Sequence, residues 1–272
     1  MMATSPDRAS SQMSANTQET VLCEVEGRLA TITLNRPERR NGFNNRMLRE
    51  LYETLREVEG DDSVSVVLLT GAGRAFCPGA DFGAYASGER QERNRPEYFH
   101  ASRLLHEMPK VTIAAVNGAC AGGGLGLACA CDLRYASESA VFNTAFLGVA
   151  LSGDMAVAWL LPRIVGSSMA RELYFTSSKF SAAEAKEMGL VLRTFPDDSF
   201  RDEVRAIADG ISRSAPLAIG EIKRNFVTAE TLPMRDYVEL EAARQNRLGR
   251  SKDSREAFRA FLEKRQPRFE GR

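Results

Sequence analysis

The sequence has 272 residues, of which 43% are hydrophobic and 26% are charged, and its 36 Lys and Arg residues balance 36 Asp and Glu residues. This length and composition are typical of a globular protein that buries a large core. The charge balance gives no indication of binding to nucleic acid or to an anionic membrane surface, so specificity has to come from a local site.

The N-terminal residues and the cysteines bear on the cellular compartment. Residues 1–19 contain no apolar stretch of the kind found in secretory signals, and we expect them to form a disordered leader. The five cysteines include no C-x-x-C pair and no histidine at zinc spacing, which predicts reduced, mostly buried thiols and no metal site. We therefore expect a cytoplasmic protein.

The first part of the chain alternates predicted strands and helices. Residues 21–35 form two alternating runs around Gly27, which predicts a β-hairpin, and residues 47–58 carry apolar side chains at helical spacing. The buried strand SVSVVLLTGAG, a polar helical stretch over residues 90–107 and the strand VTIAAV follow. A Gly-rich turn, a helix over residues 125–131 and the short strands LRYA and AVFN come next. This order predicts an α/β protein built from repeated ββα units.

The last third of the chain has a different pattern. Ser181 and Glu184 in SAAEAKEMGL have the spacing of a capping box, and Gly189 stands where that helix should end. From residue 201 onward the sequence shows helical periods and no convincing strand. We therefore expect a β-containing core over residues 20–200 and a helical region over residues 201–272.

One stretch needs a membrane check and then a functional one. The uncharged residues between Lys110 and Asp132 could span a bilayer by length, but Asn117 and several glycines dilute their apolarity, so we expect no membrane span. Within this stretch, CAGGGLGLACACD contains three consecutive glycines, Gly122–Gly124. Their spacing fits neither the Rossmann nor the Walker phosphate-binding pattern.

What remains is a strand, a glycine turn and the start of a helix. Free backbone N–H groups at a helix N-terminus favour a phosphate, a carboxylate or the oxyanion of a polarised carbonyl. The alternative is that the glycines only allow a helix to pack closely on a sheet. A second glycine turn, FCPGADF at residues 76–82, could converge with the first on one oxygen atom.

Three motifs in this order, FCPGADF, IAAVNG-x-x-x-GGG and the C-terminal AFLEKR, closely resemble the crotonase superfamily, the enoyl-CoA hydratase and isomerase family. The resemblance extends from about Val21 to the C-terminus. It implies a spiral of ββα units followed by a helical trimerisation region, and therefore a homotrimer or a dimer of trimers. It also implies an acyl-CoA thioester as substrate, with no separate cofactor because coenzyme A is part of the substrate.

The resemblance implies roles for particular residues. The backbone N–H groups of Ala80 and Gly123 would hold the thioester carbonyl as an oxyanion hole. Residues Asp81, Phe82 and Gly83 would border the acyl chain or the pantetheine. Phe261 and Lys264 would contact the adenine and phosphates of coenzyme A across a subunit boundary, and Arg39 and Arg40 are looser candidates for the phosphates. The charged members of this set could equally be solvated surface residues.

The reaction type depends on which residue acts as the catalytic acid or base. Hydratases of the family use two carboxylates, but the corresponding positions here are Gly126 and Phe146, which cannot transfer a proton. Asp154 matches an aspartate found in relatives that shift double bonds, isomerise epoxides or displace halide, and we favour it as the proton carrier. The alternative is that Asp154 only caps the helix that begins near it, although Ser152 could supply that cap.

A single carboxylate suits an isomerase, because it can take a proton from one carbon and return it to another, whereas adding water is easier with a second group. Other possibilities are a hydratase, a decarboxylase, and a hydrolase or dehalogenase with His100 as base and Asp154 as nucleophile. His100 and Tyr85 could both reach the acyl pocket, whereas His106 is expected to be structural. Gly126 and Phe146 also leave open a non-catalytic acyl-CoA-binding protein.

Overall fold

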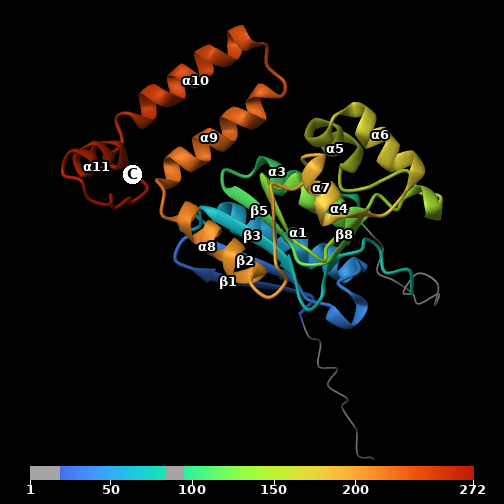
Figure 1. The fold of residues 1–272 in the computed structure, drawn as a ribbon. Coiled ribbons are helices and arrows are strands. Elements are labelled where there is room, and N and C mark those ends of the chain that lie inside the picture. The colour runs from blue at the N-terminus through green and yellow to red at the C-terminus, as the bar shows by residue number, and fades with distance from the viewer. Residues whose placement is uncertain (1–18, 84–94) are drawn as a thin grey trace, which may run out of the picture.

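The computed structural model describes residues 19–83 and 95–272. Its larger sheet has six strands in the order β1-β2-β3-β5-β7-β10 (Figure 1). β1 and β2 form the antiparallel hairpin predicted around Gly27, and the other neighbours in this sheet pair in parallel. The strands are β1 (Val21–Glu26), β2 (Leu29–Leu34), β3 (Val66–Gly71), β5 (Val111–Val116), β7 (Leu133–Ser137) and β10 (Arg193–Phe195).

A second sheet has four short strands in the order β4-β6-β8-β9. These are β4 (Ala75–Cys77), β6 (Ala119–Ala121), β8 (Val141–Asn143) and β9 (Phe180–Ser181). Each turn of the chain places a longer strand in the first sheet and a short strand in the second, as β3 and β4, β5 and β6, and β7 and β8 do. The prediction of an α/β spiral of ββα units is therefore confirmed.

Most of the helices fall where the apolar spacing predicts them. α1 begins after Asn44, whose side chain accepts a hydrogen bond from the backbone N–H of Met47, and its apolar face is buried. The capping box of Ser181 and Glu184 is present at the start of α7. The helices are α1 (Asn45–Gly60), α3 (Ala101–Glu107), α4 (Gly123–Ala130), α5 (Val157–Val165), α6 (Ser167–Thr176), α7 (Ala182–Glu187), α8 (Phe200–Ser212), α9 (Pro216–Ala229), α10 (Met234–Leu248) and α11 (Lys252–Leu262), with short 3₁₀ helices η1 (Pro37–Arg39), η2 (Pro96–His100) and η3 (Leu147–Val149).

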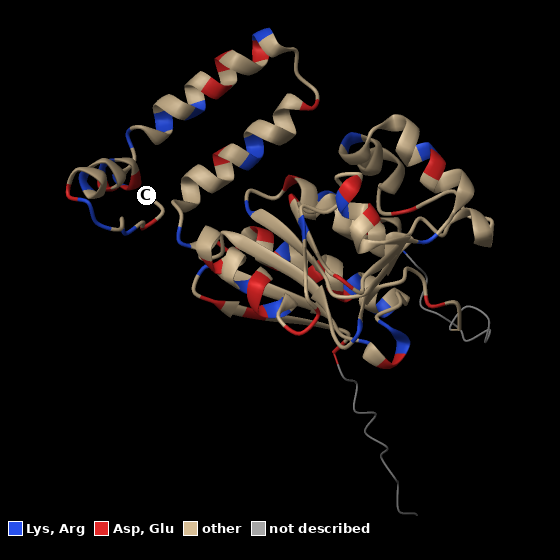
Figure 2. Cartoon of the chain, in the orientation of Figure 1, with Lys and Arg blue, Asp and Glu red and all other residues tan. Residues whose placement is uncertain are grey.

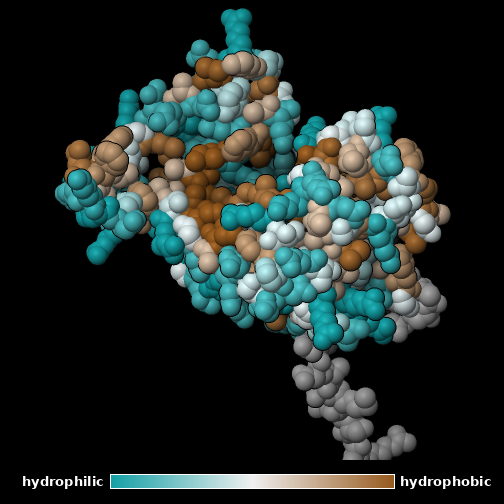
Figure 3. Space-filling view, in the orientation of Figure 1, coloured by the Kyte–Doolittle hydropathy of each residue, from teal (hydrophilic) through white to brown (hydrophobic). Residues whose placement is uncertain are grey.

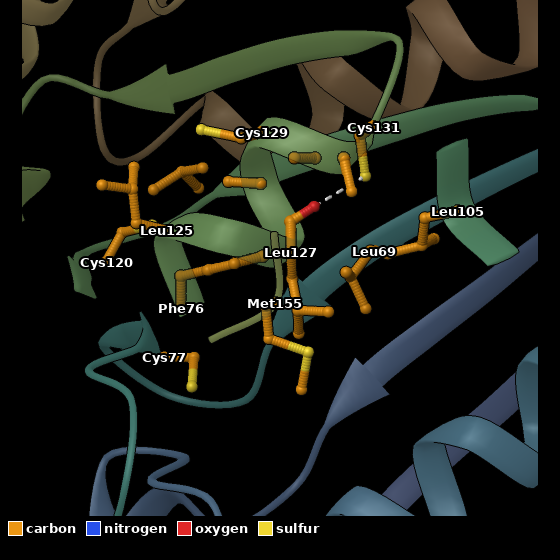
Figure 4. Packing of buried hydrophobic residues seen from close by; sticks show 14 of the residues in the cluster. Leu69, Phe76, Cys77, Leu105, Cys120, Leu125, Leu127, Cys129, Cys131 and Met155 are labelled. Atoms are coloured by element: carbon orange, nitrogen blue, oxygen red, sulfur yellow. Dashed lines mark hydrogen bonds between the residues drawn. The ribbon is translucent and has the colours of Figure 1, made fainter. Parts of the chain in front are cut away.

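The core lies on both faces of the larger sheet, which explains why its central strand β3 is buried along its whole length. In β3, Val67 and Leu69 pack in the main cluster with α1 and α4, whereas Val66 and Leu68 pack on the other face with α8. Cysteine side chains fill part of the main cluster (Figure 4). Cys77, Cys120, Cys129 and Cys131 are buried free thiols, and Cys23 is exposed.

The C-terminal helices are anchored to the core by an ion pair between a buried lysine and a partly exposed aspartate. The Nζ of Lys223 on α9 donates to Oδ2 of Asp132 at 2.5 Å and to the carbonyl oxygen of Leu105 at 3.0 Å. His106 on α3 lies 3.0 Å from the carboxylate of Glu230, at the end of α9. His106 therefore has the structural position expected from the sequence.

Beyond this anchor, α10 and α11 extend away from the main body (Figure 1). Positive and negative side chains are mixed along α9 and α10 (Figure 2). Apolar side chains gather in the hollow between these helices and the main body (Figure 3). Exposed apolar residues of this region are Ile222, Phe226, Met234, Val238, Phe258, Phe261 and Leu262. Among the described residues, no helix combines the length and apolarity that a membrane crossing requires.

Candidate active site

The two glycine turns meet because β4 and β6 are neighbouring parallel strands. Their pairing places Cys77 beside Cys120, so the turns that follow them lie at the same edge of the second sheet. Gly79 has φ of +91°, and a Cβ added to it would lie only 3.5 Å from the Gly123 nitrogen. The two turns therefore lie in close proximity, as the expected convergence requires, and the binding of one oxygen atom by both turns stays a prediction.

The three glycines of the triplet serve different purposes. Gly122 has φ of +52°, a conformation that residues with side chains rarely adopt. A Cβ on Gly124 would lie 2.0 Å from the carbonyl oxygen of Cys77, so this glycine allows α4 to pack directly on β4. Close packing, the alternative interpretation of the triplet, therefore explains Gly124, whereas Gly122 provides the left-handed turn and Gly123 leaves room for Phe43 and Asp154.

The backbone N–H groups of Ala80 and Gly123 are unpaired in the part of the chain that the structure describes. Gly123 is the first residue of α4, where an N–H has no partner within the helix. Phe43 donates its N–H to the carbonyl of Gly79 at 2.7 Å and accepts one from Asp81 at 2.9 Å, which leaves the Ala80 N–H facing away from this pairing. Within residues 19–83 and 95–272, neither N–H donates to a backbone or side-chain acceptor.

Asp154 lies directly beside this turn. A Cβ on Gly123 would come within 2.8 Å of Oδ1 of Asp154, and this oxygen is buried without a hydrogen-bond partner in the described structure. Burial raises the pKa of Asp154 to about 6, because the charged carboxylate loses solvation. A carboxyl group with this pKa can exchange a proton near neutral pH.

Asp154 does not cap the following helix. The N-cap of α5 is Ala156, in a left-handed conformation, and no side chain donates or accepts a capping hydrogen bond there. Met155 is also left-handed, with φ of +46°. The capping alternative for Asp154, and the idea that Ser152 supplies the cap, are therefore wrong.

Gly126 lies behind the catalytic candidate. A Cβ on Gly126 would come within 2.4 Å of the Met155 Cβ and 2.9 Å of the Met155 carbonyl oxygen. Gly126 thus provides the space into which Met155 packs (Figure 4 shows Met155 beside α4). This position has no room for the carboxylate that hydratases carry unless the residue next to Asp154 moves.

A cavity of about 410 Å³ opens beside the turns. Among the described residues that line it, Asp154 alone is ionisable, and most of the others are apolar. The cavity wall includes Phe82, which was expected to border the acyl chain or the pantetheine, and Phe146, which stands where a hydratase would carry its second carboxylate. The lining residues are Phe43, Leu48, Ala80, Phe82, Phe99, Phe146, Leu151, Ser152, Gly153 and Asp154.

The residues next to Ala80 have separate positions. Asp81 pairs with Arg36, whose Nη2 lies 2.9 Å from its Oδ2, so this carboxylate ties the loop before α1 to the turn that contains Ala80. Gly83 is exposed and lies near the Asp81 and Arg39 side chains rather than in the cavity wall. No sequence pattern indicates that Arg36 is the partner of Asp81, because the two residues are far apart along the chain.

The other predicted residues are more scattered. His100 is exposed on η2 and is absent from the cavity wall, which its neighbour Phe99 lines instead. Tyr85 lies outside the described residues. Arg39 and Arg40 are exposed at η1, whereas Phe261 and Lys264 are exposed at the end of α11. α11 lies at the opposite end of the molecule from α5, which follows Asp154, so one chain does not bring Phe261 and Lys264 to this cavity (Figure 1).

Comparison with known proteins decides the family. The enoyl-CoA hydratase/isomerase profile matches residues 24–272. The chain belongs to the enoyl-CoA hydratase/isomerase family. The resemblance to the crotonase superfamily is thereby confirmed, and with it an enzyme family that acts on acyl-CoA thioesters.

Members of the enoyl-CoA hydratase/isomerase family with different names are similarly related to this chain. It is 38% identical over 263 residues to the 1,2-epoxyphenylacetyl-CoA isomerase of Escherichia coli, and the alignment covers 93% of this chain and 99% of the relative. It is 40% identical over 255 residues to a probable enoyl-CoA hydratase of Rhodobacter capsulatus, with 93% and 98% covered. The crystal structure of an enoyl-CoA hydratase from Bacillus anthracis superposes with a TM-score of 0.88 at 31% identity, covering 93% of this chain and all of that one.

Several residues of this candidate site could not be assigned to it from the sequence alone. Phe43, Leu48 and Phe99 line the cavity from segments distant from the glycine turns. Tyr174 on α6 stacks on Phe146 with ring centroids 5.9 Å apart, and its buried hydroxyl has no partner in the described structure. Only the folded chain brings these aromatic residues together.

Proposed function

We propose that this family member is an isomerase-type acyl-CoA enzyme in which Asp154 moves a proton between two carbons of a thioester enolate. The observation that carries the proposal is the position of Asp154, whose unpartnered carboxylate lies against Gly123 as the ionisable group among the described cavity residues. The similar 1,2-epoxyphenylacetyl-CoA isomerase adds support from a relative whose name denotes isomerisation.

The proposed chemistry divides between the backbone and one side chain. The N–H groups of Ala80 and Gly123 donate hydrogen bonds to the thioester carbonyl oxygen and stabilise the negative charge that develops on it when the α proton leaves. Loss of one such donor in other enzymes costs about 3–4 kcal/mol of barrier. Asp154 takes the proton as a carboxylate and returns it to a different carbon as a carboxylic acid, so no net proton is consumed.

Hydration of a double bond is the second candidate, supported by the name of the Rhodobacter capsulatus relative. It is less well supported by the residues of the site. Gly126 is filled from behind by Met155, and Phe146 presents an aromatic ring, so neither position can orient or activate water. Asp154 would have to perform both proton transfers and position the water unaided.

The test is to incubate the purified protein with 3-enoyl-CoA and with 2-enoyl-CoA in deuterated water and to analyse the products by mass spectrometry. Isomerase chemistry predicts interconversion of the two thioesters with deuterium at the α or γ carbon. Accumulation of 3-hydroxyacyl-CoA as the main product would instead assign a hydratase. Binding of acyl-CoA with neither interconversion of the two thioesters nor deuterium in either one would identify a non-catalytic binding protein.

We further propose that the working unit is a trimer or a dimer of trimers. The exposed apolar side chains of α9–α11, such as Phe226, Met234 and Phe258, provide a surface for subunit contact. Such assembly would also carry Phe261 and Lys264 of one subunit toward the coenzyme A of a neighbour, where Arg39 and Arg40 could meet its phosphates. Sedimentation analysis of the protein gives the mass, and a monomer at micromolar concentration would contradict this assembly.

A further inference from the structure

Two phenylalanine rings stand over the glycine turn that is proposed to hold the thioester. A Cβ on Gly123 would lie 2.9 Å from Cε2 of Phe43, and a Cβ on Gly122 would lie 3.8 Å from Cε1 of Phe146. The rings therefore contact consecutive residues of the turn. An acyl group whose carbonyl binds at Gly123 would meet both rings within the first carbons beyond the carbonyl.

Both rings are held firmly. Phe43 is 4% exposed, and its backbone N–H and carbonyl both hydrogen-bond to the backbone of the Gly79–Asp81 turn. Phe146 is 5% exposed and lies nearly parallel to the ring of Tyr174, at an interplanar angle of 17°. A flexible aliphatic wall could adapt to an acyl chain of any shape, but these two rings present fixed surfaces.

Further aromatic side chains continue the wall. Phe82, next to the oxyanion turn, and Phe99, on η2, line the same cavity from two other segments of the chain. Four phenylalanine side chains, together with Leu48 and Leu151, thus surround the space in front of Asp154. Among the described residues of the cavity wall, Ser152 and Asp154 have polar side chains, and both lie on the segment that precedes α5.

We infer that the acyl group of the substrate carries an aromatic ring attached within one or two carbons of the thioester carbonyl. Aromatic rings attract one another at centroid separations of about 4.5–7 Å through offset stacked or edge-to-face contacts, beyond the effect of buried area alone. Phe43 and Phe146 provide such contacts next to the carbonyl, and Phe82 and Phe99 extend them outward. This inference rests on the proposed binding of a thioester at Ala80 and Gly123.

Three thioesters with equal numbers of acyl carbons test the inference: phenylacetyl-CoA, cyclohexylacetyl-CoA and octanoyl-CoA. Their affinities are measured by isothermal titration with the full chain and again with Asp154→Asn, so that the comparison needs no proton transfer. Phenylacetyl-CoA should bind about tenfold more tightly than either of the others, as two aromatic contacts of ordinary strength imply. Equal or tighter binding of octanoyl-CoA or cyclohexylacetyl-CoA would overturn the aromatic assignment.

A pair of variants links the preference to the cavity. Phe146→Leu should reduce the advantage of phenylacetyl-CoA to about threefold and leave octanoyl-CoA affinity nearly unchanged, because one of the two aromatic contacts is lost. Phe175→Leu is the matched control, since Phe175 is 74% exposed on α6 and lies outside the cavity wall. An unchanged preference in Phe146→Leu would contradict the inference. Failure of all three thioesters to bind would contradict the proposed function and the inference together, whereas equal binding contradicts the inference alone.

Discussion

Replacing Gly126 with alanine tests whether the packing behind Asp154 positions it for proton transfer. The added Cβ would lie 2.4 Å from the Met155 Cβ and 2.9 Å from Cγ2 of Val157. Carbon atoms in favourable contact are about 3.5–4.0 Å apart, so Met155 has to move by about 1 Å. The contact involves the Met155 Cβ and its carbonyl oxygen, and the backbone at Asp154 therefore has to move as well.

The expected effects are large for a single methyl group. Overpacking of this kind costs about 1–3 kcal/mol of folding free energy. Displacing a reacting group by about 1 Å costs on the order of 100-fold in rate. We therefore expect Gly126→Ala to remain folded at room temperature but to lose about two orders of magnitude in kcat/KM for isomerisation.

The assay combines urea unfolding with the rate of 3-enoyl-CoA isomerisation. Gly60→Ala is the control, because Gly60 ends α1 and a Cβ there meets no heavy atom within 4 Å. This control should keep its rate and gain a few tenths of a kcal/mol, up to about 1 kcal/mol, in stability. A wild-type value of kcat/KM in Gly126→Ala would refute the argument that displacing Met155 also displaces the Asp154 carboxylate.

The remaining predictions concern three side chains, Asp154, Lys223 and Tyr174. Burial raises the pKa of Asp154 to about 6, so the rate of α-proton exchange should fall about tenfold per pH unit below that value in a pH–rate profile. This pKa also lies above the ordinary value of about 4, so folded-state stability is lost as the pH rises from about 4 to about 6 and the buried carboxylate ionises. Asp154→Asn removes this charge, so it should raise the Tm at about pH 8 and have less effect at about pH 4. Lys223→Met removes the cation that Asp132 binds and should cost about 1.5–3 kcal/mol in urea unfolding, and an unchanged midpoint would contradict the anchoring of α9. Tyr174→Phe removes a buried hydroxyl that has no hydrogen-bond partner in the described structure, so the free energy of unfolding should stay unchanged or rise by about 1 kcal/mol. A fall of more than about 1 kcal/mol in the free energy of unfolding would show that the hydroxyl has a partner.

The sequence predicts those features that depend on neighbouring residues. Alternation around Gly27 predicted the hairpin, apolar spacing predicted α1, and the pair Ser181 and Glu184 predicted the start of α7. β9 and β10 were not predicted, because two or three residues are too few to show a periodicity.

The candidate site depends more on contacts between distant segments. The glycine turns were visible as motifs, but the juxtaposition of Asp154 with Gly123 and the space that Gly126 leaves for Met155 exist only in the folded chain. The pairing of Phe146 with Tyr174 likewise joins η3 to α6. A sequence pattern reports which residue types occur, whereas the direction of each side chain is set by tertiary packing.

The most direct test of the account is the rate of deuterium incorporation at the α carbon of an acyl-CoA thioester, compared between the wild-type protein and Asp154→Asn. General acid–base catalysis contributes about 100-fold to 10,000-fold, so the Asp154→Asn rate should fall by at least about 100-fold while thioester binding persists. Ser152→Ala, a change in the same segment of the cavity wall, should keep a rate close to the wild-type value. Exchange in Asp154→Asn within about twofold of wild type would contradict the claim that Asp154 carries the proton.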